Sequence, residues 1–218
     1  MGIARAGVLT GLGCLGLLGA AALGFFLLAS GDSQEEAPPA VQATNTPAVA
    51  QTAPPATDSS PPLAGSYRMI IDRLGVDAPV ATYSLDENRV PIVPTGPDAA
   101  EVVAWYDFSA KPGTGGNSVF AGHVTWFGNA VFLSLDTLQA GDMIRLRDDQ
   151  GAEAAYRVTA NQTLAPDDPE AVRTMYPTDK DIVTIITCGG TFFDTGDPIA
   201  GGDYTHRIVI KAELVSVS

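Results

Sequence analysis

Residues 63–218 are predicted to form a mainly β domain, either a barrel or a sandwich, and three observations support this fold class. Short apolar runs rich in Val, Ile, Thr and Tyr recur along the segment. Turn-forming pairs such as Pro112-Gly113 and Gln150-Gly151 separate these runs. Helical stretches are few and short, which favours a barrel or sandwich over alternating βαβ units.

The individual elements follow from where the apolar runs begin and end. Strands are predicted at residues 68–72, 79–83, 118–122, 143–147, 155–160, 181–188 and 206–217. Gly, Pro or Asp lies between successive runs, and these residues interrupt strands. Short helices are expected near residues 98–104, 130–138 and 168–175.

The N-terminal residues 1–31 are predicted to be a cytoplasmic start followed by one transmembrane helix. Residues 6–31 carry no charged side chain, and about 25 helical residues reach roughly 37 Å, more than the hydrocarbon core of a bilayer. Arg5 precedes the run and Asp32 follows it, which orients the N-terminus towards the cytoplasm. The alternative is a cleavable signal peptide, but the run is longer than the usual ~7–15 apolar residues of such a peptide.

Residues 32–62 are predicted to be a disordered linker. Pro recurs there among Ala, Thr, Gln and Ser, with almost no large apolar side chain. Such a segment cannot bury enough surface to offset the entropy lost on ordering. We therefore expect an extended tether between a membrane anchor and an extracytoplasmic domain.

Composition excludes several classes of function. The chain has 12 Lys and Arg against 25 Asp and Glu, a net charge of −13, which leaves no basic surface for nucleic acid. Two cysteines cannot build a disulfide-dense scaffold or a four-cysteine zinc site. We expect no cofactor and no metal site. The acids Asp167, Asp168 and Glu170 could bind calcium, but we interpret them as a solvated loop.

Few side chains are available for thiol or imidazole chemistry. Cys14 lies in the apolar run, where a thiol is most simply a small apolar side chain. Cys188 ends the apolar strand at 181–188 and is followed by Gly189-Gly190, so we expect it at an open end of a sheet. A thiolate there needs a cationic neighbour. The alternative is a buried, inert cysteine.

Two residues are candidates to act with Cys188. His123 follows an apolar run, and Gly122 beside it indicates tight backbone packing around an exposed ring. Arg207 starts the last strand next to His206. Because successive strand residues point to opposite faces, His206 faces away if Arg207 faces Cys188. A guanidinium there can stabilise an oxyanion; the alternative for Arg207 is a solvated charge at a strand end.

Several segments of the chain resemble the sortase family. Residues 184–188, reading TIITC, are similar to the T-L-x-T-C signature that carries the sortase nucleophile, with Ile185 in place of the commoner Leu. Residues 121–123 resemble the catalytic-histidine segment, and residues 206–210 resemble the strand with the essential arginine. The resemblance covers about residues 67–215, and the Thr-Cys-Gly-Gly continuation is most like the class F or class E groups.

This resemblance implies an eight-stranded closed β-barrel and a membrane-anchored cysteine transpeptidase. Cys188 would attack an LPxTG-like sorting signal between Thr and Gly, and His123 would be the general acid and base. Arg207 would stabilise the oxyanion or hold the substrate, and Thr187 would support substrate binding. The thioacyl product would pass to an amine of a peptidoglycan precursor or to another acceptor. The loops at 161–180 and 189–205 would form the groove walls.

Two other functions remain open at this point. An L,D-transpeptidase also uses a thiol on a β-rich fold, but it typically places the cysteine in an S-x-G-C-type motif, which is absent here. A non-catalytic anchored binding module would bury Cys188 without using it. A sortase predicts loss of turnover when Cys188, His123 or Arg207 is replaced, whereas a binding module predicts no turnover to lose.

Overall fold

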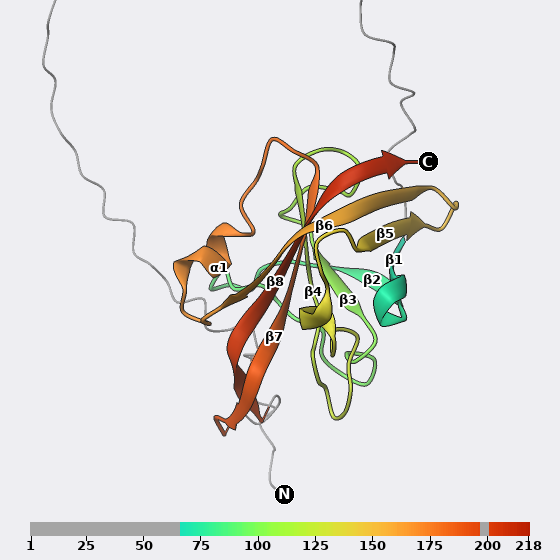
Figure 1. Ribbon diagram of the computed structural model, residues 1–218. Coiled ribbons are helices and arrows are strands. Elements are labelled where there is room, and N and C mark those ends of the chain that lie inside the picture. The colour runs from blue at the N-terminus through green and yellow to red at the C-terminus, as the bar shows by residue number, and fades with distance from the viewer. Residues whose placement is uncertain (1–65, 197–200) are drawn as a thin grey trace, which may run out of the picture. The chain divides into compact units, whose positions relative to one another are not determined.

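The computed structural model describes residues 66–196 and 201–218, and in this part of the chain it forms a β-barrel with a few short helices (Figure 1). The strands are β1 (Tyr67–Ile71), β2 (Val76–Tyr83), β3 (Val103–Tyr106), β4 (Asn117–Ala121), β5 (Met143–Asp148), β6 (Glu153–Leu164), β7 (Ile182–Asp194) and β8 (Gly202–Val217). The helices are the 3-10 turns η1 (Asp72–Leu74) and η2 (Leu135–Thr137) and the α-helix α1 (Pro169–Arg173).

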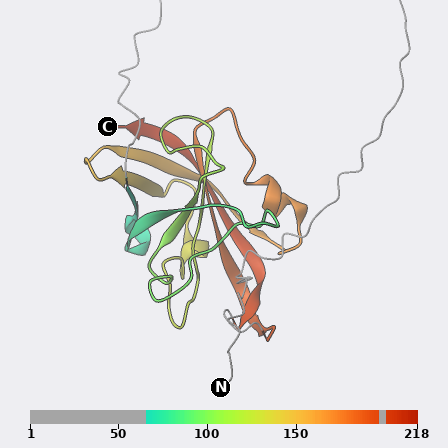
Figure 2. The same ribbon diagram turned by 180° about the vertical axis from the view of Figure 1, so that it is seen from behind.

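The strands close into a barrel in the order β1-β2-β3-β4-β7-β8-β6-β5. The β2–β3 and β4–β7 pairs are parallel, and the others are antiparallel. Strands β7 and β8 run side by side along their length, as both views show (Figures 1 and 2). The mainly β prediction is therefore confirmed, and so is the closed barrel of eight strands.

All seven predicted strands are present, but one strand was not expected. The helix predicted at 98–104 is wrong: a turn leads into β3, which begins at Val103. Ala99, Ala100 and Glu101 are helix-forming residues, and an apolar run of four residues does not distinguish strand from helix. The helix α1 lies within the predicted 168–175 stretch, and η2 lies within 130–138.

Two apolar clusters lie on opposite faces of the sheet. The first contains residues from all eight strands, among them Met69, Phe120 and Ile185, and fills the barrel interior. The second covers the outer face of β3, β4, β7 and β8, where Ile186 and Val209 pack with neighbours. Because alternate residues of β4, β7 and β8 enter the two clusters, these strands are apolar on successive positions.

The predicted anchor (residues 1–31) and linker (residues 32–62) lie outside the described residues. Within the described part, no helix is long and apolar enough to cross a membrane. Both predictions therefore remain predictions.

Candidate active site

The barrel order brings the three candidate residues onto adjacent strands. Cys188 on β7 is the direct cross-strand partner of Arg207 on β8. On the other side of β7, Ala121 of β4 pairs with Ile186. His123 lies two residues beyond Ala121, where β4 ends, and Cys188 lies two residues beyond Ile186 along β7.

The same pairing indicates which face of the sheet carries the site. Residues directly opposite each other in an antiparallel pair project to one face, so Cys188 and Arg207 share a face. Ile186 lies two residues before Cys188 and Val209 lies two residues after Arg207, so both point to this same face. Both belong to the second apolar cluster. The site therefore lies where the outer cluster ends.

Hydrogen bonds from Thr187 and to Ile186 connect the residue before His123 to β7. Its hydroxyl donates to the carbonyl of Gly122 at 2.7 Å, and the Gly122 amide donates to the carbonyl of Ile186 at 3.4 Å. Thr187 is buried. The structure thus gives the Thr187 side chain a contact with the backbone beside His123.

The His123 ring is enclosed, which corrects the expectation of an exposed ring. It is only 6% exposed, and its Nε2 donates to the carbonyl of Pro94 at 2.8 Å. It also stacks on the Trp126 ring with centroids 4.6 Å apart, and the Trp126 indole donates to the carbonyl of Gly96 at 3.0 Å. Because a carbonyl only accepts, this geometry puts the ring proton on Nε2 and leaves the lone pair of a neutral ring on Nδ1.

Burial lowers the pKa of His123 below its ordinary value of 6.5, and the hydrogen bond to the Pro94 carbonyl opposes this effect. Below about pH 6.5, His123 is therefore protonated in the unfolded chain while it is still neutral in the folded protein. We expect the free energy of unfolding to fall as the pH drops through this window. Urea denaturation of wild type and His123→Gln at two pH values, one on each side of about 6.5, measures the change. An equal loss in both proteins would contradict the assignment to His123.

The Arg207 guanidinium is buried and ion-paired, not a solvated charge at a strand end. It is 3% exposed and donates through Nη2 to the carboxylate of Asp203 at 2.9 Å. Its Nη1 donates to the carbonyls of Tyr204 and His206, both at 3.2 Å. Sequence reasoning missed Asp203, although its spacing of four along one strand places it on the same face as Arg207.

His206 lies on the other face of β8, as the alternation predicts. It pairs with Gly189, and its Nδ1 is 2.8 Å from the hydroxyl of Thr205. Gly190 adopts a positive φ of 81°, and a Cβ on it would lie 2.3 Å from His206 Nδ1. The glycine after Cys188-Gly189 is therefore required by both backbone conformation and space.

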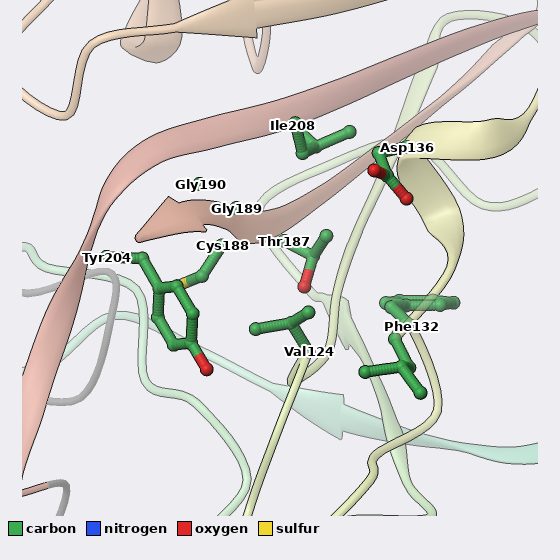
Figure 3. Close-up of a pocket in the computed structure, with 10 residues that line it drawn as sticks. Val124, Phe132, Asp136, Thr187, Cys188, Gly189, Gly190, Tyr204 and Ile208 are labelled. Carbon is green, nitrogen blue, oxygen red and sulfur yellow. The ribbon is translucent and has the colours of Figure 1, made fainter. Parts of the chain in front are cut away.

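Cys188 is 5% exposed. Attack on a carbonyl requires its thiolate. The residue also lines a pocket of about 140 Å³. In Figure 3, Cys188 and Tyr204 lie on one side of this pocket, Phe132 and Asp136 on the other, and Thr187 between them.

The acidic residues before α1 have a structural contact. The Asp168 carboxylate accepts a hydrogen bond from the Glu170 amide at 2.9 Å and thereby caps the helix. Over residues 66–196 and 201–218, no group of three or more His, Cys, Asp or Glu side chains is placed to hold a metal ion.

Gly122, next to His123 in the chain, packs closely against Phe132. A Cβ on Gly122 would lie 2.7 Å from the Phe132 ring, and Phe132 is fully buried. We expect Gly122→Ala to lower the free energy of unfolding by about 1–3 kcal/mol through overpacking. Thermal or urea denaturation measures this. The double variant Gly122→Ala/Phe132→Leu should recover part of the loss; additive losses would contradict the contact.

Comparisons with known proteins agree with this fold. The sortase domain family matches residues 69–215. The structure is similar to sortase A from Corynebacterium diphtheriae, with 22% identity, a TM-score of 0.51, and coverage of 70% of this chain and 61% of that one. It is also similar to sortase A from Listeria monocytogenes, with 19% identity, a TM-score of 0.51, and coverage of 70% and 88%. No curated protein sequence matches the chain significantly.

Proposed function

This chain belongs to the sortase family, and we propose that it is a membrane-anchored transpeptidase that cleaves an LPxTG-like sorting signal between Thr and Gly and joins the protein to a cell-wall amine. The observation that carries the proposal is the register of three adjacent strands. Cys188 lies directly opposite Arg207, and His123 lies two residues beyond the end of β4, which is the other neighbour of β7.

In the proposed first half-reaction, the Cys188 thiol passes its proton to His123, and the resulting thiolate attacks the carbonyl carbon of the signal's Thr. The C–S bond forms, the C–N bond to Gly breaks, and His123 gives a proton to the leaving amine. Since Nε2 of His123 is engaged by the Pro94 carbonyl, Nδ1 is the nitrogen that would hold the transferred proton. The product is a thioester on Cys188.

Arg207 is the proposed stabiliser of the oxyanion in both half-reactions. A guanidinium has five N–H donors, and the contacts with Asp203, Tyr204 and His206 use three. Two donors remain for a substrate oxygen. Because the side chain is buried and held by Asp203, it is oriented before substrate arrives, which is what transition-state stabilisation requires.

The finer features of the proposal rest on the sequence. The uncharged run at residues 6–31 and the charges flanking it support a single-pass anchor with the N-terminus in the cytoplasm and the catalytic domain outside. The Thr-Cys-Gly-Gly segment supports class F or class E. The proposed walls of the signal groove are residues 161–180 and 189–205, which include the end of β6, the end of β7 and the start of β8. The proposed partners are sorting-signal proteins and a peptidoglycan precursor or another amine.

The decisive experiment incubates the full-length protein, kept reduced, with LPxTG-type peptides and an amine, and identifies the products by mass spectrometry. We expect a product in which the Thr carbonyl is joined to the amine. Activity only on peptidoglycan stem peptides would instead identify an L,D-transpeptidase, and no turnover of either substrate would identify a binding module. Either result overturns the proposal.

A further inference from the structure

We infer that the pocket beside Cys188 is the binding site for the acceptor, and that it selects an acceptor with two amino groups, one that attacks and one that Asp136 holds. This inference rests on the proposed function, because the pocket needs an acyl group on Cys188 to perform group transfer. It adds the chemical class of the second substrate.

The pocket lies on the face of β7 and β8 opposite to the one that carries Arg207. Thr187 and Ile208 line it, and they are cross-strand partners on the face opposite to Cys188 and Arg207. Cys188 also lines the pocket, so it borders both approaches. A transpeptidase needs two such approaches, since the acyl donor still occupies its groove when the acceptor arrives.

The walls of the pocket suit an aliphatic chain. Val124, Phe132 and Ile208 supply apolar surface. Tyr204 closes one side, and its hydroxyl is 2.7 Å from the hydroxyl of Thr125, which ties β8 to the segment after His123. The volume of about 140 Å³ is that of a small group rather than a folded partner.

The carboxylate of Asp136 gives the pocket a negative charge. It is the one charged residue among those that line the pocket. Within the described part of the chain its backbone carbonyl accepts from Asn161, whereas no hydrogen bond or ion pair of the described residues involves its carboxylate. A carboxylate at the edge of a partly apolar pocket attracts an ammonium group. Figure 3 places Asp136 across Thr187 from Cys188, so it holds a second amine and not the attacking one.

The transfer step balances with these groups. The neutral amine of the acceptor attacks the thioester carbon, an amide C–N bond forms, and the C–S bond breaks. The amine proton passes to His123, and Cys188 leaves as the thiolate. Asp136 takes no proton in this step; it positions the acceptor through the second ammonium.

The test uses the reduced full-length protein, an LPxTG-type peptide, and the diamines from diaminopropane to diaminohexane, each against the monoamine of the same length. The readout is the ratio of amide product to hydrolysis product. We expect wild type to favour at least one diamine by about two- to fivefold. Asp136→Asn should reduce the ratio to that of the monoamine. Asp149→Asn, the same change on the β5–β6 turn, should keep the wild-type ratio.

Equal ratios for diamines and monoamines in wild type would overturn the inference, and so would a diamine preference that survives Asp136→Asn. Binding is measured separately by titrating the same diamines into the full-length protein and following backbone amide resonances. Shifts around the pocket that disappear in Asp136→Asn support the inference even if no sorting peptide is turned over, in which case the proposed function alone fails. If no peptide is turned over and the diamines also cause no shifts around the pocket, the inference is contradicted.

Discussion

Replacement of Cys188 by alanine is expected to reduce transpeptidation by about 10³-fold or more, because the acyl group then has no atom to which it can be transferred. The side chain is small, and we expect the free energy of unfolding to change by only about 1 kcal/mol in the reduced protein. Product analysis by mass spectrometry measures turnover, and thermal denaturation under the same reducing conditions measures stability.

The control for this experiment is direct detection of the thioester. Wild type incubated with sorting peptide and no amine should gain the mass of the acyl fragment on the peptide that contains Cys188, and Cys188→Ala should not. Turnover that survives in a folded Cys188→Ala protein would refute the nucleophilic role. Both stability measurements use reductant, so that oxidation of the Cys188 thiol does not add to the comparison.

Replacement of Arg207 by methionine is expected to lower both activity and stability, for different reasons. Loss of one oxyanion donor reduces kcat by about 10²–10³-fold. The variant also leaves the carboxylate of Asp203 buried without its cation, and breaking a buried ion pair costs about 3–5 kcal/mol. Peptide turnover and urea denaturation measure the two effects independently.

A double variant separates these effects. Asp203→Asn/Arg207→Met removes both charges, so its free energy of unfolding should lie closer to that of wild type than the value for Arg207→Met alone. Its activity should stay low, since the oxyanion donor is still missing. If the double variant regained activity along with stability, Arg207 would be a structural residue and not a catalytic one.

Most strands were predictable because their sequence pattern is local. The run at residues 181–188 is apolar at successive positions and contains Cys188 near its end, and β7 occupies those residues and continues beyond them. The strand β3 was not predictable, because its four residues follow helix-forming Ala and Glu. Its strand conformation comes from pairing with β2 and β4, and the pattern of four residues does not encode that pairing.

For the candidate site, the sequence supplied candidate residues and did not supply their environment. The motif positions identified Cys188, His123 and Arg207, and the alternation along β8 placed His206 on the opposite face. The burial of His123 under Pro94 and Trp126 came as a correction. These contacts join segments 29 residues apart in one case, and no local pattern encodes such a contact.

By itself, the sequence determined the mainly β class, the order of the strands along the chain, the candidate residues and the family they resemble. These features depend on residue type, on the two-residue period of strands and on turn-forming residues, all of which act locally. Only the tertiary structure decided that β4, β7 and β8 lie next to each other, that Asp203 neutralises Arg207, and that Asp136 charges a pocket beside Cys188. The physical reason is that pairing, burial and charge neutralisation depend on which distant segments meet when the barrel closes.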